Sequence, residues 1–284
     1  MGYYERALVL AIVIGVLCGL VGTVVVLRRR AFFTQALTHA TFPGAVLAAA
    51  LGVNVMIGAF ASSVLLIVVM TLLGRVTRQG SQVASGVVLT AGFALGVFLQ
   101  AFFPELPIHV DTYLIGSILN ATDGDLTASG AVLVVAVLVL LGTGKEMLFS
   151  TLDPAGYRVA GYREWVVEAV VLGLIVLTVV TAMPAVGAIR ALALVAAPAA
   201  AARLVARTTT QIFVLAPVIG ALSGVIGVLA SRLLGVSAGA AIALTAALFF
   251  VLALGISRLA GLRLRGSRAN GAAPRAPVQE GVPS

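Results

Sequence analysis

Residues 28–52 read RRRAFFTQALTHATFPGAVLAAALG, and this stretch places a histidine deep inside an apolar helix. Three arginines mark one face of a membrane, and about twenty apolar or small residues follow, which is the length that crosses a bilayer. His39 lies nine residues beyond Arg30. At 1.5 Å per residue this is about 14 Å, near the midplane of a hydrocarbon core about 30 Å thick. An ionisable group at that depth predicts a cavity or a pathway.

Pro43 adds to this prediction, because it stands four residues after His39 in the same helix. Proline has no N–H group, so the carbonyl of His39 loses its usual partner within the helix. Gln35 and Thr38 fall on the same side of the helix as His39. We therefore expect these three side chains and the freed carbonyl to face one polar pocket.

The composition is that of an all-α polytopic membrane protein. The chain has 284 residues, of which 61% are hydrophobic and 10% charged, and its mean hydropathy is +1.16. The apolar runs are continuous rather than alternating, which excludes a β-barrel. We expect about nine transmembrane helices, at 6–27, 33–51, 54–74, 84–103, 127–144, 165–183, 185–202, 211–231 and 238–257. Eight is the alternative, since segment 185–202 is rich in alanine and contains Pro198.

The net charge of +8 is better explained by topology than by nucleic-acid binding, because the arginines stand beside the spans. With the N-terminus outside, fifteen of the eighteen lysines and arginines fall inside. The C-terminus is then inside, and the first apolar run is a retained span rather than a signal peptide. We expect one transmembrane domain over 1–261 and a disordered cytoplasmic tail over 262–284. The chain has a single cysteine, Cys18, which excludes a thiolate metal cluster. It contains no P-loop and no hydrolase motif, so no motif indicates an enzyme.

Five segments, in order, resemble the ABC-3 family of membrane permeases, the manganese/zinc class of bacterial ABC importers. They are AFFTQALTHATFPGAVLA, SQVASGVVLTAGFALGVFL, YLIGSILNATDGDL, KEMLFSTLDPAGYRVAG and MPAVGAIRALALVAAPAAAARLV. The resemblance runs from Arg28 to Ile256. It implies a type II importer-like permease in the bacterial cell membrane, without catalytic activity and without a resident cofactor.

The resemblance also implies partners and a cargo. The partners are a cytoplasmic ABC ATPase dimer, an extracytoplasmic solute-binding protein and a second permease copy, identical or a sister, which forms the pathway at the interface. The cargo is a divalent transition metal, Zn²⁺ or Mn²⁺, passing His39. The family motif Asp-Ala-x-Ser-His-Ala pairs an acid with the histidine, whereas this chain has Gln35 in the acid's place. The uncharged amide weakens the case for a bare metal ion, and a histidine that only bonds a neighbouring helix is the alternative.

Arg190 is the second departure, and it has two interpretations. Its side chain either snorkels to the outer interface or faces the cavity between the permeases. In the cavity it would repel a bare dication and suit an anionic chelate or haem. Pro198 and Pro217 free two carbonyls, which is typical both of transport sites and of packing kinks.

Two loops are candidate contact sites for the partners. In the inner loop 145–164, Asp153 and Pro154 predict the capped start of a short helix. Ala155 and Gly161 are small enough for close docking, so this loop is our candidate for contacting the ATPase, with an ordinary solvated loop as the alternative. In the outer loop 104–126, three side chains would receive the binding protein or concentrate cations, if they are not simply solvated: Glu105, His109 and Asp111.

Three other functions remain open at the level of the sequence. The same machinery would carry a metal chelate or haem if Gln35 and Arg190 set the cargo. A proton-coupled secondary transporter would need carboxylates in mid-membrane, whereas Glu168 lies near the end of a span. A membrane scaffold without transport would leave His39 unexplained.

Overall fold

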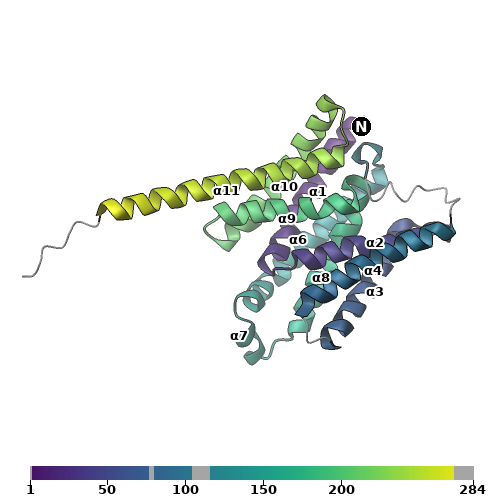
Figure 1. Ribbon diagram of the computed structural model, residues 1–284, viewed down its shortest axis with the longest axis horizontal. Helices are drawn as coiled ribbons and strands as arrows, with labels where there is room; N and C mark the ends of the chain where they lie inside the picture. Colours follow the sequence, from purple (N-terminus) through teal and green to yellow (C-terminus); the bar gives the residue numbers. More distant parts are fainter. Residues whose placement is uncertain (1, 77–79, 104–115, 272–284) are drawn as a thin grey trace, which may run out of the picture.

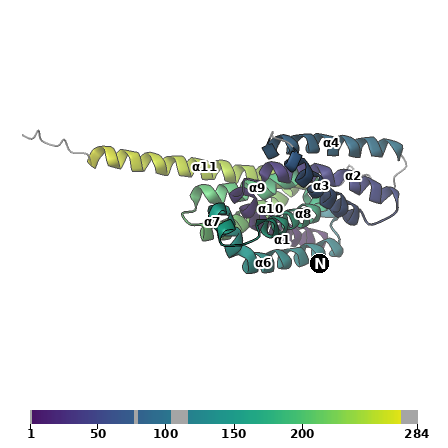
Figure 2. The same cartoon turned by 90° about the horizontal axis from the view of Figure 1, so that it is seen from below.

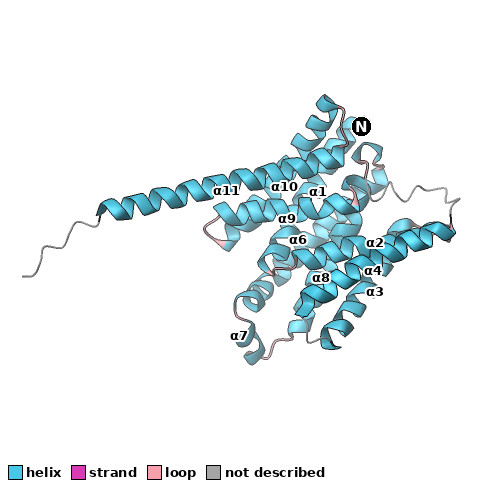
Figure 3. Ribbon diagram, viewed as in Figure 1, coloured by secondary structure: helices cyan, strands magenta, loops and turns pink. Residues whose placement is uncertain are grey.

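The computed structural model describes residues 2–76, 80–103 and 116–271, and all its regular structure within these ranges is helical (Figure 3). Two short helices are η1 (Ile118–Asn120) and α7 (Pro154–Val159). The long helices are α1 (Tyr3–Leu27), α2 (Ala31–Ala50), α3 (Val55–Val76), α4 (Gly80–Phe102), α6 (Asp123–Leu152), α8 (Glu164–Val186), α9 (Ala188–Val205), α10 (Thr209–Leu234) and α11 (Ala238–Gly271). Each long helix coincides with one expected span, which confirms the all-α polytopic fold.

Six described helices are long and apolar enough to cross a membrane by length and composition: α1, α6, α8, α10, residues 85–102 of α4 and residues 238–259 of α11. The apolar segment Val55–Met70 of α3 is shorter. In α2, Gln35, His39 and several threonines lower the hydropathy of a helix that is otherwise long enough. The polar face of α2 is therefore an exception within an apolar bundle.

Helix ends follow local capping chemistry. Thr122 and Asp125 form a capping box at the start of α6, and Thr208 and Gln211 form one at the start of α10. A break at Gly187, with φ of 92°, separates α8 from α9. The positive φ explains the glycine, because other residues rarely adopt it.

Helix α1 lies inside the bundle and packs most extensively against α10, and also against α9 and α6 (Figures 1 and 2). Cys18 in its middle is fully buried. Close approach is possible because glycines meet: a Cβ atom on Gly15 would overlap the backbone of Gly220. Gly19 in α1 has the same relation to Ala216 in α10.

The bundle has two polar ends. At one, which we call the Asp123 end, Arg6 pairs with Asp123 at 2.7 Å, and the guanidinium of Arg232 lies 4.6 Å from the ring centre of Tyr4. At the other, the Glu168 end, the Glu168 carboxylate pairs with Arg28 at 3.0 Å and with Arg30 at 2.6 Å. These pairs show that α1 and α6 start at the same end and that α8 starts at the opposite one.

Two loop boundaries differ from the expectation. Helix α6 continues to Leu152, so the first part of loop 145–164 is helical. Helix α11 runs to Gly271 and projects beyond the bundle (Figure 1), so it covers residues 262–271 of the expected disordered tail. Leucine and arginine at 262–265 favour the continuation of the helix. Residues 272–284 lie outside the described ranges, and the division into a membrane domain and a tail stays a prediction.

Candidate functional site

Gln35 and His39 meet on one face of α2. The amide Nε2 of Gln35 lies 3.0 Å from Nε2 of the His39 ring, and both side chains are half-buried. The two residues are four apart, so one helical turn brings them together. An amide nitrogen can only donate, so this geometry makes Nε2 of His39 the acceptor and places the ring proton on Nδ1.

The ring of His39 is held against α4. It meets Phe93 edge to face with ring centroids 5.5 Å apart, and Phe93 in turn stacks on Phe42 at 5.9 Å. The Nδ1 atom of His39 is buried and has no hydrogen-bond partner. A neutral imidazole with one nitrogen bonded to a movable amide can offer that nitrogen to a passing cation once Gln35 rotates away.

The neighbouring hydroxyls of α2 are bonded to backbone. Thr38 is fully buried and donates to the Gln35 carbonyl at 2.7 Å, while Thr41 donates to the Thr38 carbonyl at 2.7 Å. Ser62 of α3 donates to the Thr41 carbonyl at 3.4 Å. The structure therefore brings Gln35 and His39 together as expected, whereas the Thr38 hydroxyl is occupied within its own helix.

Arg190 lies in the first turn of α9 at the Asp123 end. Its Nη1 atom is 3.4 Å from the Ser237 hydroxyl, just before α11 begins, and the side chain is half-buried. A Cβ atom on Gly239 would contact the same nitrogen. This places the Arg190 guanidinium at a polar end of the bundle, and both interpretations of its role stay predictions.

The expected short helix after Asp153 is present as α7. Asp153 caps it by accepting from the Gly156 amide at 2.9 Å, Pro154 is its first residue, and the chain turns away at Gly161 with φ of 81°. Ala155 and Val159 are exposed on it, the latter to 89%. Helix α7 is therefore a capped and largely exposed short helix at the Glu168 end of the bundle.

Aromatic residues that the sequence did not single out anchor α7. Tyr157 is buried, stacks on Tyr162 at 5.0 Å and meets Phe149 edge to face at 5.5 Å. Burial, and then the charge of Glu146, raise the pKa of the Tyr157 hydroxyl above its ordinary value. In the sequence, only the recurrence of aromatic residues between 149 and 162 points to these contacts.

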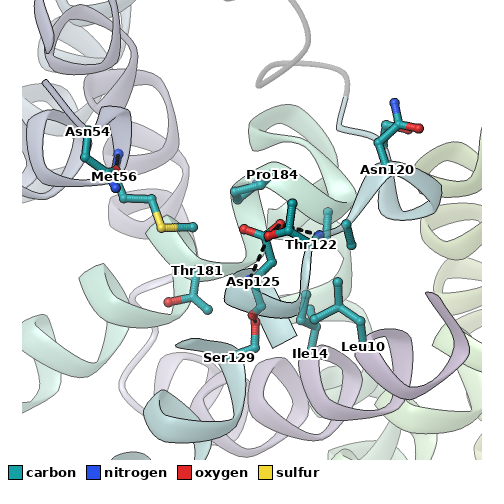
Figure 4. A pocket seen from close by; sticks show the side chains of 13 residues that line it. Leu10, Ile14, Asn54, Met56, Asn120, Thr122, Asp125, Ser129, Thr181 and Pro184 are labelled. Carbon is teal, nitrogen blue, oxygen red and sulfur yellow. Dashed lines mark hydrogen bonds between the residues drawn. The ribbon is translucent and has the colours of Figure 1, made fainter. Parts of the chain in front are cut away.

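The three outer-loop residues Glu105, His109 and Asp111 lie outside the described residues. Beside the place where the described chain resumes, a cavity of about 390 Å³ opens between α1, α3, η1, α6 and α8 (Figure 4). Thr181 and the thioether of Met56 point into it (Figure 4). One oxygen of Asp125 accepts from both the amide and the hydroxyl of Thr122 at 2.8 Å. This partly polar cavity at the Asp123 end was not predicted.

Metal-binding side chains do not gather into a cage in the described part of the chain. No group of three or more histidines, cysteines or acids occurs there. His39 with Gln35 supplies one imidazole and one amide, a donor set suited to a transient contact with a transition metal rather than to a resident ion.

The comparisons with known proteins agree with one another. The ABC 3 transport family matches residues 1–257. The manganese transport system membrane protein MntC of Halalkalibacterium halodurans is 28% identical over 263 residues, which cover 93% of this chain and 90% of MntC. The chelated iron transport system membrane protein YfeD of Yersinia pestis is 31% identical, covering 89% of this chain and 84% of YfeD.

A solved structure agrees with the fold. PsaBC from Streptococcus pneumoniae in complex with Fab superposes with a TM-score of 0.82 at 29% identity, covering 89% of this chain and 91% of that one. A family of ABC transporters implies ATPase and solute-binding partners and sets aside the proton-coupled transporter and the scaffold. The chain belongs to the ABC 3 transport family and is a multi-pass, non-catalytic permease subunit of an ABC transporter.

Proposed function

We propose that this permease imports a divalent transition metal, Mn²⁺ or Zn²⁺, and that the ion passes His39. The main support for this role is the contact between Gln35 and His39 on α2, which presents an imidazole nitrogen in a half-buried setting. Imidazole suits these metals. The relative MntC is named for manganese transport, which supports the same class of cargo.

The Gln35 amide makes the contact weak. It carries no charge to offset the desolvation of a dication, so His39 holds the ion only in transit. Transport benefits from this, since an ion that binds too tightly does not leave. Gln35 acts as a movable cover on Nε2 of His39.

We further propose that the Glu168 end faces the cytoplasm. Basic residues gather at that end, among them Arg28, Arg30 and Lys145, and cytoplasmic segments are enriched in such residues. Helix α7, with exposed Ala155 and Val159, then meets the ATPase. The solute-binding protein docks at the Asp123 end, and a second copy of the permease completes a homodimer around the pathway.

The test is uptake of radioactive manganese and zinc by cells carrying the full transporter with His39→Ala. We expect uptake to fall at least about ten-fold, the loss of one good ligand contact of about 1.4 kcal/mol. Gln35→Asp is the matched variant, and it should retain manganese more tightly because it adds a charge beside His39. Assembly with the ATPase and the melting temperature serve as controls for folding. Unchanged manganese and zinc uptake by His39→Ala would refute the proposed role of His39.

A metal chelate or haem is the second candidate cargo. Gln35 supplies no charge beside His39, and Arg190 places a guanidinium at the Asp123 end, which suits an anionic complex. The relative YfeD is named for chelated iron. Uptake in the presence of excess EDTA separates the cases: transport of free Mn²⁺ stops, whereas transport of a preformed haem or chelate continues.

A further inference from the structure

A groove between α1, α6 and α10 is left open near the Glu168 end. It encloses about 410 Å³ and its wall is mainly apolar, with leucines of α1 and α6 and Phe213 of α10. At one end it carries three polar side chains, Lys145, Thr209 and Thr210. Figure 2 shows α6 on the side of the bundle opposite α4, so the groove is remote from His39 and Phe93.

The depth of the groove matches one membrane leaflet. Lys145 lies twenty-two residues after Asp123 along α6, which is about 33 Å of helix and exceeds the hydrocarbon thickness of about 30 Å. Lys145 therefore stands at the level of the lipid headgroups when Asp123 is at the opposite surface. Val137, which also lines the groove, lies about 21 Å along α6, within the hydrocarbon.

The polar end of the groove is positively charged. Lys145 is exposed, and no carboxylate of the described residues lies within ion-pair distance of it. The start of α10 adds to this potential, because a helix N-terminus favours negative charge. The capping bonds of α10 run between Thr208 and Gln211, while Thr209 and Thr210 face the groove.

We propose that this groove binds an anionic glycerophospholipid from the leaflet at the Glu168 end, with an acyl chain against the leucines and the phosphate at Lys145. A free phosphate would leave the apolar wall uncovered. A zwitterionic lipid would gain less from Lys145, because its own ammonium group offsets the phosphate.

Gly144 is a position at which a larger side chain would fill the groove without disturbing the packing of the bundle. It lines the groove, and a Cβ atom there would meet no atom within 4 Å. Gly142 has the same free space on the same helix, but it does not line the groove. Gly144→Leu should therefore block the acyl chain, and Gly142→Leu is its matched control.

The experiment measures lipid retained by the purified full-length permease, using native mass spectrometry after incubation with equal amounts of phosphatidylglycerol and phosphatidylcholine. We expect preferential retention of phosphatidylglycerol. Lys145→Gln should lower the ratio of the two lipids about five-fold. Gly144→Leu should remove the bound lipid, whereas Gly142→Leu should match the parent protein. Arg163→Gln should match it too, because Arg163 precedes α8 at the Glu168 end and does not line the groove.

Three results would overturn the proposal. One is equal retention of the two lipids by the parent protein. Another is a preference for phosphatidylglycerol that Lys145→Gln and Gly144→Leu leave intact. The third is crosslinking of two permease copies through a cysteine introduced at Val137, which would assign the groove to a protein interface.

Discussion

The Glu168 carboxylate links three helices through arginine. Arg28 reaches it at 3.0 Å and also bonds the Ser150 hydroxyl and the Met147 carbonyl of α6, while Arg30 reaches the carboxylate at 2.6 Å. The side chain of Arg28 is only 10% exposed and that of Glu168 27%. Removing the carboxylate would leave a nearly buried guanidinium without its counter-charge, and such a loss is costly.

We predict that Glu168→Gln lowers the free energy of unfolding by about 2 kcal/mol, between the values for exposed and buried ion pairs. Glu164→Gln is the control, because the pair of Glu164 with Arg158 is 4.0 Å long and largely exposed. It should cost less than about 0.5 kcal/mol. Denaturant unfolding in detergent measures both variants, and an equal effect of the two would contradict the ranking.

At the scale of the helices, the contact between α1 and α10 depends on small residues. Gly15 and Gly220 leave no room for a side chain between the two backbones. In lipid there is little hydrophobic driving force between helices, so close packing of small residues supplies much of the association energy.

Gly15→Ala should therefore destabilise the permease by about 1–3 kcal/mol, the usual cost of overpacking. Gly173→Ala in α8 is the matched substitution, because a Cβ atom there meets no atom within 4 Å. It should be neutral or stabilising by up to about 1 kcal/mol, since alanine favours helix. Melting temperatures in detergent compare the two. A Gly15→Ala protein with an unchanged melting temperature would contradict this prediction, because α1 and α10 would then be able to move apart at little cost.

At the scale of the whole molecule, the two polar ends predict the orientation in the membrane. Cys18 is fully buried, so introduced cysteines can report the topology against a silent background. Leu233 at the end of α10 is 84% exposed, and Val159 in α7 is 89% exposed at the opposite end. We expect Leu233→Cys to react with a membrane-impermeant maleimide in intact spheroplasts, and Val159→Cys to react only after lysis, in cells that lack the ATPase. The reverse pattern would invert the proposed topology.

The sequence by itself determined the helices and the local contacts. Apolar runs of about twenty residues predict spans because a membrane helix satisfies its backbone within its own segment. The cap of α7 by Asp153 and the contact between Gln35 and His39 were also predictable. Each joins residues that are three or four apart in the chain.

Only the tertiary structure decided which helices meet. It brought Phe93 to His39, Glu168 to Arg28, and Arg190 to Ser237. The cavity beside Asp125 and the groove beside Lys145 are also products of packing. These contacts join segments far apart in the chain, and nearly uniform apolar surfaces carry little sequence information about their partners, because the choice depends on the close fit of small residues.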